Sequence, residues 1–253
     1  PLAYIEGKEC AYYGRTDLIE KYNITIDDKK VYTLDELEQI FAKIKAGEGD
    51  GFYCVGGEST AFTVLDMTHE LDTLGASSNG AGGVVDIGSD FTSTKVIDLY
   101  ESPLYADFAN RMYRWTEAGY RSKDAANNQE TTVAQLQTGK YLGYFMEGTG
   151  NALADQENSN GVDLTQSRMT QPYSATGMFQ SVLWSIPTTC ENPEKTMQFL
   201  NLIYEDPAIS ALLQFGIEGT SYTVVNKDDN GTVIQFPEGQ NAMTVPYYQM
   251  FGV

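Results

Sequence analysis

The stretch TVAQLQTGKYLGYFM, Thr132–Met146, joins a helix signal directly to a strand signal. Thr132–Gln137 is predicted to form a short helix, and Gly139 is placed to end it. Tyr141–Met146 is apolar and aromatic, which favours a strand, and Glu147–Asn151 reads as a turn beyond it. Helix and strand signals alternate in this way along the chain, so the sequence predicts an α/β fold.

Four helix starts share one pattern, a side chain that can cap the first turn. Thr33 and Glu36 form a capping box before a periodic apolar run. Ser102–Pro103, Asn192–Pro193 and Asp206–Pro207 each place a capping residue before a proline in the first turn. Each of these starts predicts a helix with one apolar face. The side chains expected on these faces include Leu104, Phe108, Met112, Trp115, Met197, Leu200, Tyr204, Ile209, Leu212 and Leu213.

The remaining segments give weaker signals. Strands are predicted at Val84–Ile87 and Gln180–Ile186, and a hairpin is predicted from Tyr222–Val225 to Thr232–Phe236. Residues 155–177 are polar and show no periodicity.

The composition excludes several classes of function. The 253 residues carry a formal net charge of −19, whereas binding to nucleic acid or to an anionic membrane surface needs clustered Lys and Arg. Hydrophobic residues make up 42% of the chain, enough for a sizeable core. Neither a signal peptide nor an apolar run near 18 residues is present. The acidic balance is typical of a soluble secreted or surface protein, and attraction of cationic ligands is the alternative.

Residues for covalent or metal chemistry are sparse. Cys10, Cys54 and Cys190 are far apart, so we expect small buried thiols and no zinc site. His69 is the only histidine, lies outside any catalytic motif and is expected on a helix surface. We expect no cofactor and no metal. With 35 Asp and Glu, a glycosidase-like pair of carboxylates remains the enzymatic alternative.

Several segments, in order, resemble the extracellular solute-binding proteins of sugar ABC importers (family 1-like). Gly216–Tyr222 is similar to an element of a subgroup that has a C-terminal domain of unknown function. The other matching segments are Tyr13–Tyr22, Tyr32–Leu37, Glu117–Ala125, Leu136–Tyr141 and Ile186–Lys195.

The resemblance implies a periplasmic-binding-protein type II-like lobe, a mixed sheet flanked by helices, plus hinge-crossing helices. Residues 1–180 would form the second lobe. Residues 181–253 would form a hinge-crossing strand, helices and a hairpin that pack toward a first lobe, which this fragment lacks. The implied function is reversible capture of a mono- or oligosaccharide for ABC permease subunits, without catalysis. The implied location is extracellular, on a cell-surface lipoprotein or in the periplasm, with a lipid anchor on the full-length precursor only.

The resemblance also implies a ligand site on loops beyond strand ends, because aromatic rings cover sugar faces and polar groups bind hydroxyls. The matching loops are Tyr53–Phe62, Glu147–Asn151 and Gln171–Phe179. The candidate partners for sugar hydroxyls are Glu58, Ser59, Glu147, Thr149 and Asn151. The candidate aromatic platforms are Phe62, Tyr173 and Phe179. Core or loop packing is the alternative for each ring, and a solvated turn is the alternative for Glu147. A non-catalytic adhesion module is the third hypothesis for the whole chain.

Overall fold

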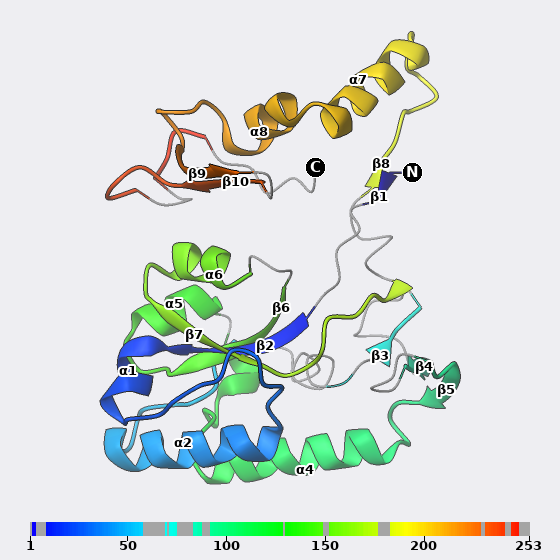
Figure 1. Ribbon diagram of the computed structural model, residues 1–253. Coiled ribbons are helices and arrows are strands. Elements are labelled where there is room, and N and C mark those ends of the chain that lie inside the picture. Colours follow the sequence, from blue (N-terminus) through cyan, green and yellow to red (C-terminus); the bar gives the residue numbers. More distant parts are fainter. Residues whose placement is uncertain are drawn as a thin grey trace. The chain divides into compact units, whose positions relative to one another are not determined.

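The computed structural model describes residues 2–3, 9–57, 69, 71–74, 83–87, 92–128, 130–148, 152–176, 183–228, 231–240 and 244–247. The chain forms two compact units (Figure 1). Unit 1 comprises Pro1–Tyr4 and Phe179–Val253, and unit 2 comprises Ile5–Met178.

The centre of unit 2 is a three-stranded antiparallel sheet in the order β6-β2-β7. Strand β2, Glu9–Arg15, pairs on one side with β6, Gly143–Gly148, and on the other with β7, Leu164–Arg168. Residues Glu9 through Gly14 of β2 are all buried. The strand is therefore covered on both faces.

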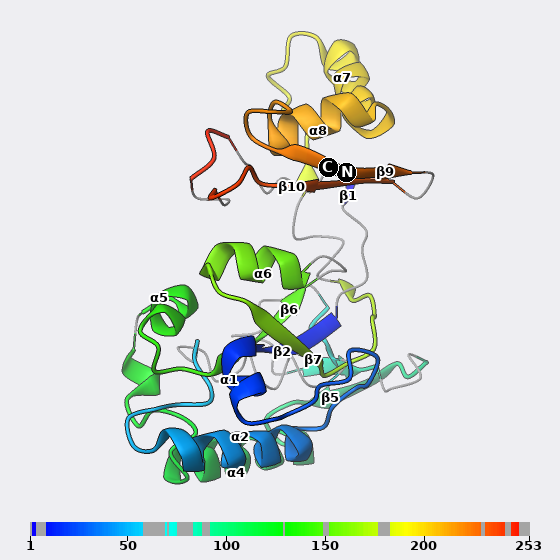
Figure 2. The same ribbon diagram turned by 60° about the vertical axis from the view of Figure 1, so that its left-hand side comes forward.

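Helices cover the two faces of this sheet (Figures 1 and 2). Helices α2, Leu34–Glu48, and α4, Pro103–Glu117, lie side by side on one face. Helix α6, Ala152–Asn160, lies on the other face, with α5, Thr132–Gln137, beside it. The short helix α1, Thr16–Lys21, follows β2 directly, and a 3-10 turn, η1, spans Ala125–Asn127.

Strand β2 sends alternate side chains into two separate cores. Tyr12 packs against Phe41 of α2 and Phe145 of β6, with ring centroids 5.1 Å apart in both pairs. Trp115 of α4 completes this aromatic group and is fully buried. On the other face Tyr13 packs with Tyr144 in a smaller cluster under α5 and α6.

Unit 2 also contains a small antiparallel sheet in the order β3-β4-β5. Its strands are Leu71–Asp72, Gly83–Asp86 and Lys95–Asp98. The chain passes from β5 to the N-cap of α4 at Ser102.

The described residues of unit 1 form two strand pairs and two helices. Strand β1, Leu2–Ala3, pairs with β8, Leu183–Trp184. Strands β9, Thr223–Asp228, and β10, Gly231–Gln235, form an antiparallel hairpin. Helices α7 and α8 span Pro193–Glu205 and Pro207–Phe215.

All four predicted helix starts are confirmed. Thr33 and Glu36 form the complete capping box at α2. Ser102, Asn192 and Asp206 each accept a backbone N–H in the first turn of α4, α7 and α8. These signals succeed because capping depends on neighbours within one turn. Within the described residues, no helix is both long and apolar enough to cross a membrane.

Two sequence-based expectations were wrong. Leu212 is exposed rather than inward. His69 lies in a bend and not on a helix. Residues 155–177, which show no periodicity, contain most of α6 and all of β7, and the polar residues of β7 are held by pairing with β2.

Gly143 is required where β6 meets β2. A Cβ at this position would overlap the Tyr13 carbonyl oxygen, whereas a Cβ at Gly83 would make only an ordinary contact with Val96 at 3.9 Å. We expect Gly143→Ala to destabilise the chain by about 1–3 kcal/mol and Gly83→Ala to change stability far less. Urea unfolding followed by tryptophan fluorescence measures both. Equal effects of the two substitutions would contradict the tight β2–β6 register.

Candidate functional site

Three polar side chains gather at one end of the central sheet. The Glu9 carboxylate begins β2, and Arg168 ends β7. Arg168 Nε lies 2.8 Å from Glu9 Oε2, and Gln166 Nε2 donates a 2.6 Å hydrogen bond to Glu9 Oε1. We call Glu9, Gln166 and Arg168 the Glu9 cluster. Glu9 is 7% exposed, so its carboxylate is held almost entirely by these two partners.

The register of the sheet explains why these residues meet. Arg168 is opposite Ala11, and Gln166 is opposite Tyr13. Because side chains alternate between faces, Glu9, Ala11 and Tyr13 share the face that α6 covers. The cluster therefore extends one face of the sheet toward the start of β2.

A buried tyrosine network lies on the same face. Tyr144 Oη donates to Gln156 Oε1 and accepts from Asn160 Nδ2, at 2.8 and 2.7 Å. Burial raises the pKa of Tyr144 to about 12. Burial, followed by the charge of Glu9, raises the pKa of Tyr13 well above its usual value, and within the described residues its hydroxyl has no hydrogen-bond partner. These phenols stay neutral at physiological pH.

One acidic side chain accompanies this network from α6. Burial raises the pKa of the Asp155 carboxyl above its usual value, and Asp155 is one of the charges that raise the pKa of Tyr13. The α6 face of the sheet therefore holds both Glu9 and Asp155 near the Tyr13 phenol.

Two of the ligand-contacting residues expected from the sequence lie in the described part of the chain. Glu147 is exposed and lies within strand β6, opposite Cys10, rather than in the turn that the sequence predicted. Tyr173 is 4% exposed and packs in the core cluster around Tyr12. The other six fall outside the described residues: Glu58, Ser59, Phe62, Thr149, Asn151 and Phe179. The role of the predicted set in binding stays a prediction.

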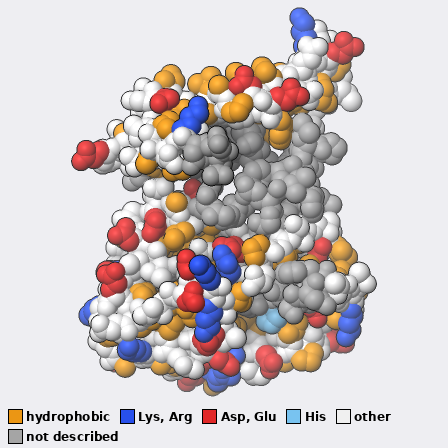
Figure 3. Space-filling model, viewed as in Figure 1, with side chains coloured by type: hydrophobic (Ala, Val, Ile, Leu, Met, Phe, Trp, Pro, Cys, Tyr) orange, Lys and Arg blue, Asp and Glu red, His pale blue; other side chains and the backbone are white. Residues whose placement is uncertain are grey.

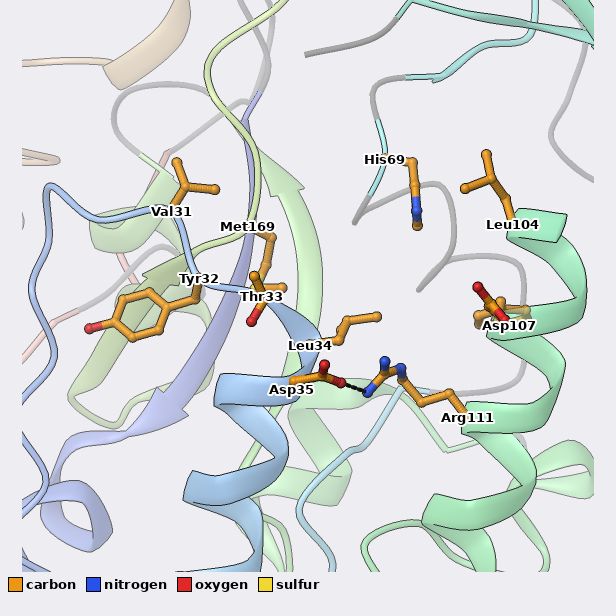
Figure 4. Close-up of a pocket in the computed structure, with 11 residues that line it drawn as sticks. Val31, Tyr32, Thr33, Leu34, Asp35, His69, Leu104, Asp107, Arg111 and Met169 are labelled. Atoms are coloured by element: carbon orange, nitrogen blue, oxygen red, sulfur yellow. Dashed lines mark ion pairs between the residues drawn. The ribbon is translucent and has the colours of Figure 1, made fainter.

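A separate pocket of about 320 Å³ lies between the first turns of α2 and α4 (Figure 4). Figure 4 shows His69 entering from another segment and pointing into this cavity. Arg111 binds Asp35 at 2.7 Å and Glu38 at 2.9 Å, which ties α4 to α2. The volume is at the lower end of the range for small-molecule sites. The lining is Val31, Tyr32, Thr33, Leu34, Asp35, His69, Leu104, Asp107, Phe108, Arg111 and Met169.

Charged groups of both signs are interspersed on the face of the protein that Figure 3 shows. Figure 3 shows Asp and Glu side chains over much of the visible face, with Lys and Arg between them. Among the described residues, no group of three or more His, Cys, Asp or Glu is arranged to hold a metal ion. The expectation of no cofactor stays a prediction.

Comparison with solved structures defines the fold class. The chain is similar to the N-glycan transport solute-binding protein of Streptococcus pneumoniae, with a TM-score of 0.71 and 21% identity over 92% of this chain and 49% of that one. The complex of that protein with Man1GlcNAc gives a TM-score of 0.67 and 22% identity, over 94% of this chain and 51% of that one. The alginate-binding protein AlgQ2 gives 0.54 and 16% identity, over 92% of this chain and 49% of that one. The periplasmic-binding-protein-like fold is thus confirmed.

Comparison of sequences gives a more specific relative. The chain is 27% identical over 218 residues to a carbohydrate ABC transporter substrate-binding protein of Streptococcus pneumoniae serotype 4. The match covers 84% of this chain and 41% of the relative, so the chain spans less than half the length of that protein. No protein-family profile matches the chain. The resemblance to solute-binding proteins of sugar importers is confirmed by this relative and by the fold.

Sequence reasoning missed the Glu9 cluster. Glu9 precedes an apolar strand, and Gln166 and Arg168 lie in the stretch that showed no periodicity. The signal that locates them is the pairing of β2 with β7, which joins residues far apart in the chain.

The cysteines supply a test of the burial pattern. Cys10 and Cys54 are buried, Cys190 is partly exposed, and burial raises the pKa of Cys54 to about 12. At pH 8 the Cys54 thiol is therefore almost entirely protonated. We expect Ellman's reagent to label Cys190 rapidly in the native chain and all three cysteines in denaturant. Raising the pH to 9 should leave Cys54 unreactive, because its thiol remains protonated below its raised pKa.

The Cys190→Ser variant is the control and should lose the rapid phase. Rapid labelling of a second thiol in that variant would contradict the buried positions of Cys10 and Cys54.

Proposed function

We propose that this chain is part of the substrate-binding component of a bacterial ABC importer and takes part in reversible capture of a carbohydrate. The observation that carries the proposal is the 27% identity over 84% of this chain to a relative of that name. The shared fold with the N-glycan transport solute-binding protein supports it. In this proposal the ligand is a mono- or oligosaccharide.

The protein binds its ligand without covalent chemistry in this proposal. Its relative is named as a substrate-binding protein and not as an enzyme. A glycosidase needs one carboxylate free to act and a second that faces it. The Glu9 carboxylate instead has both oxygens engaged by Gln166 and Arg168. This engagement suits a fixed binding surface better than proton transfer.

The partners and location follow from the same relationship. The full-length protein would deliver sugar to ABC permease subunits and would bind no nucleic acid. It would lie outside the cytoplasmic membrane, as a cell-surface lipoprotein or in the periplasm, with the lipid anchor on the full-length precursor. The net charge of −19 suits this place, since it favours solubility and disfavours adhesion to anionic surfaces.

The sheet of unit 2 would provide one wall of the ligand site in a second lobe of residues 1–180. In this proposal Glu147, which is exposed on β6, binds sugar hydroxyls there. The other candidates expected from the sequence remain part of this proposal: Glu58, Ser59, Phe62, Thr149, Asn151, Tyr173 and Phe179.

Calorimetry on the full-length protein tests the proposal directly. We expect saturable binding of at least one member of a panel of neutral and acidic mono- and oligosaccharides. Incubation with chromogenic nitrophenyl glycosides should release no nitrophenol. Turnover of a glycoside by a protein that binds no sugar reversibly would favour the enzymatic alternative instead.

The helices of unit 1 expose several large apolar side chains. Met197, Phe199, Leu202 and Tyr204 on α7 are 46%, 51%, 43% and 41% exposed, and Leu212 on α8 is 50% exposed. Exposed apolar surface of this extent is typical of an interaction site. We propose that residues 181–253 pack this surface against the first lobe of the longer protein, since the chain spans only 41% of its relative.

Cysteine labelling at Phe199 tests this packing. In a Cys190→Ser background, Phe199→Cys should react with maleimide in the 253-residue chain and be protected in the full-length protein. Tyr113→Cys on α4, where Tyr113 is 70% exposed, is the control and should react in both. Rapid labelling of Phe199→Cys in the full-length protein would show that this face stays uncovered.

A further inference from the structure

The Glu9 cluster leaves donors open to a ligand. The Arg168 side chain is 29% exposed, and only its Nε forms the ion pair with the Glu9 carboxylate. Within the described residues, the two Nη groups of Arg168 have no hydrogen-bond partner. Gln166 is half-buried and uses one N–H of its amide on Glu9. Its carbonyl oxygen and second N–H have no partner among the described residues.

The same pairing fixes these groups in place. Glu9 accepts a hydrogen bond from Gln166 and forms an ion pair with Arg168, and these two contacts position the amide and the guanidinium while their remaining donor and acceptor atoms stay available. Both side chains project from a strand whose partner, β2, is buried along almost its whole length. Groups held in this way lose little conformational entropy when they bind a ligand.

The charge of the cluster indicates the kind of ligand. The carboxylate of Glu9 compensates the positive charge of Arg168, so the pair is neutral. Asp155, on the same face, adds a carboxyl, and the whole chain carries a net charge of −19. An anionic sugar would find no uncompensated cation here, whereas hydroxyl groups can accept from Arg168 and donate to Gln166.

We propose that Arg168 and Gln166, fixed by Glu9, form a specificity-determining subsite for the hydroxyl groups of a neutral saccharide. This inference rests on the proposed function. It assigns binding to Arg168 and Gln166, and a positioning role to Glu9. It also assigns the ligand class, neutral rather than acidic sugars.

The test is calorimetric titration of the full-length protein with Man5GlcNAc as the neutral probe and an alginate oligosaccharide as the acidic probe. Wild type should bind the neutral probe more tightly. Arg168→Ala should weaken neutral binding by about 10- to 100-fold, the loss expected for a charge-assisted hydrogen bond. Gln166→Ala and Glu9→Gln should weaken it less, and Arg168→Lys should recover part of the affinity.

Arg15→Ala is the matched control. Arg15 ends the same strand that Glu9 begins, is 20% exposed and binds the carboxylate of Asp17 at 2.5 Å. Its loss should change the thermal midpoint of the free protein without changing sugar affinity. Arg168→Ala should change the affinity with a similar or smaller effect on the thermal midpoint.

The possible results distinguish failure of the proposed subsite from failure of the proposed function. If the wild type binds the neutral probe and Arg168→Ala and Gln166→Ala bind it with the same affinity, the subsite is overturned. The proposed function is then unaffected. Tighter binding of the acidic probe overturns the assigned ligand class. Wild type that binds no sugar of either kind overturns both proposals. If Arg168→Ala fails to fold, Gln166→Ala and Glu9→Gln decide, and unchanged affinity in both overturns the subsite.

Discussion

The structure of unit 2 depends on the double pairing of one strand. Strand β2 forms antiparallel ladders with β6 and β7, so its backbone groups are satisfied on both edges. Its residues from Glu9 to Gly14 are all buried, with Tyr12 and Tyr13 filling opposite cores. Two helical layers, α2 with α4 and α5 with α6, cover the two faces of the sheet that this strand centres.

The pairing of β2 with β7 also brings together the polar side chains of the Glu9 cluster at the end of the sheet. Glu9 can be almost fully buried because Gln166 and Arg168 come to its carboxylate from β7. A buried carboxylate without such partners would be costly, since burial disfavours the charged form. Fold and candidate site are thus linked through one register, in which Ala11 lies opposite Arg168 and Tyr13 opposite Gln166.

The sequence was most informative where local interactions decide the structure. The capping residues Thr33, Ser102, Asn192 and Asp206 act within one turn, and each predicted helix begins where expected. Trp115, at the end of a helical apolar stripe, is fully buried as predicted. Strand β7 could not be predicted in the same way. Its polar residues show no alternation of apolar side chains. They form a strand because they pair with β2, which is far away in the sequence. The Glu9 cluster was not predicted for the same reason, because Gln166 and Arg168 lie on β7.

A crystal structure of the full-length protein with a bound neutral oligosaccharide tests the central claim most directly. We expect sugar hydroxyls within hydrogen-bond distance of Arg168 and Gln166, with the Glu9 carboxylate still in contact with both side chains. A sugar bound instead in the pocket between α2 and α4, with the Glu9 cluster uninvolved, would contradict it.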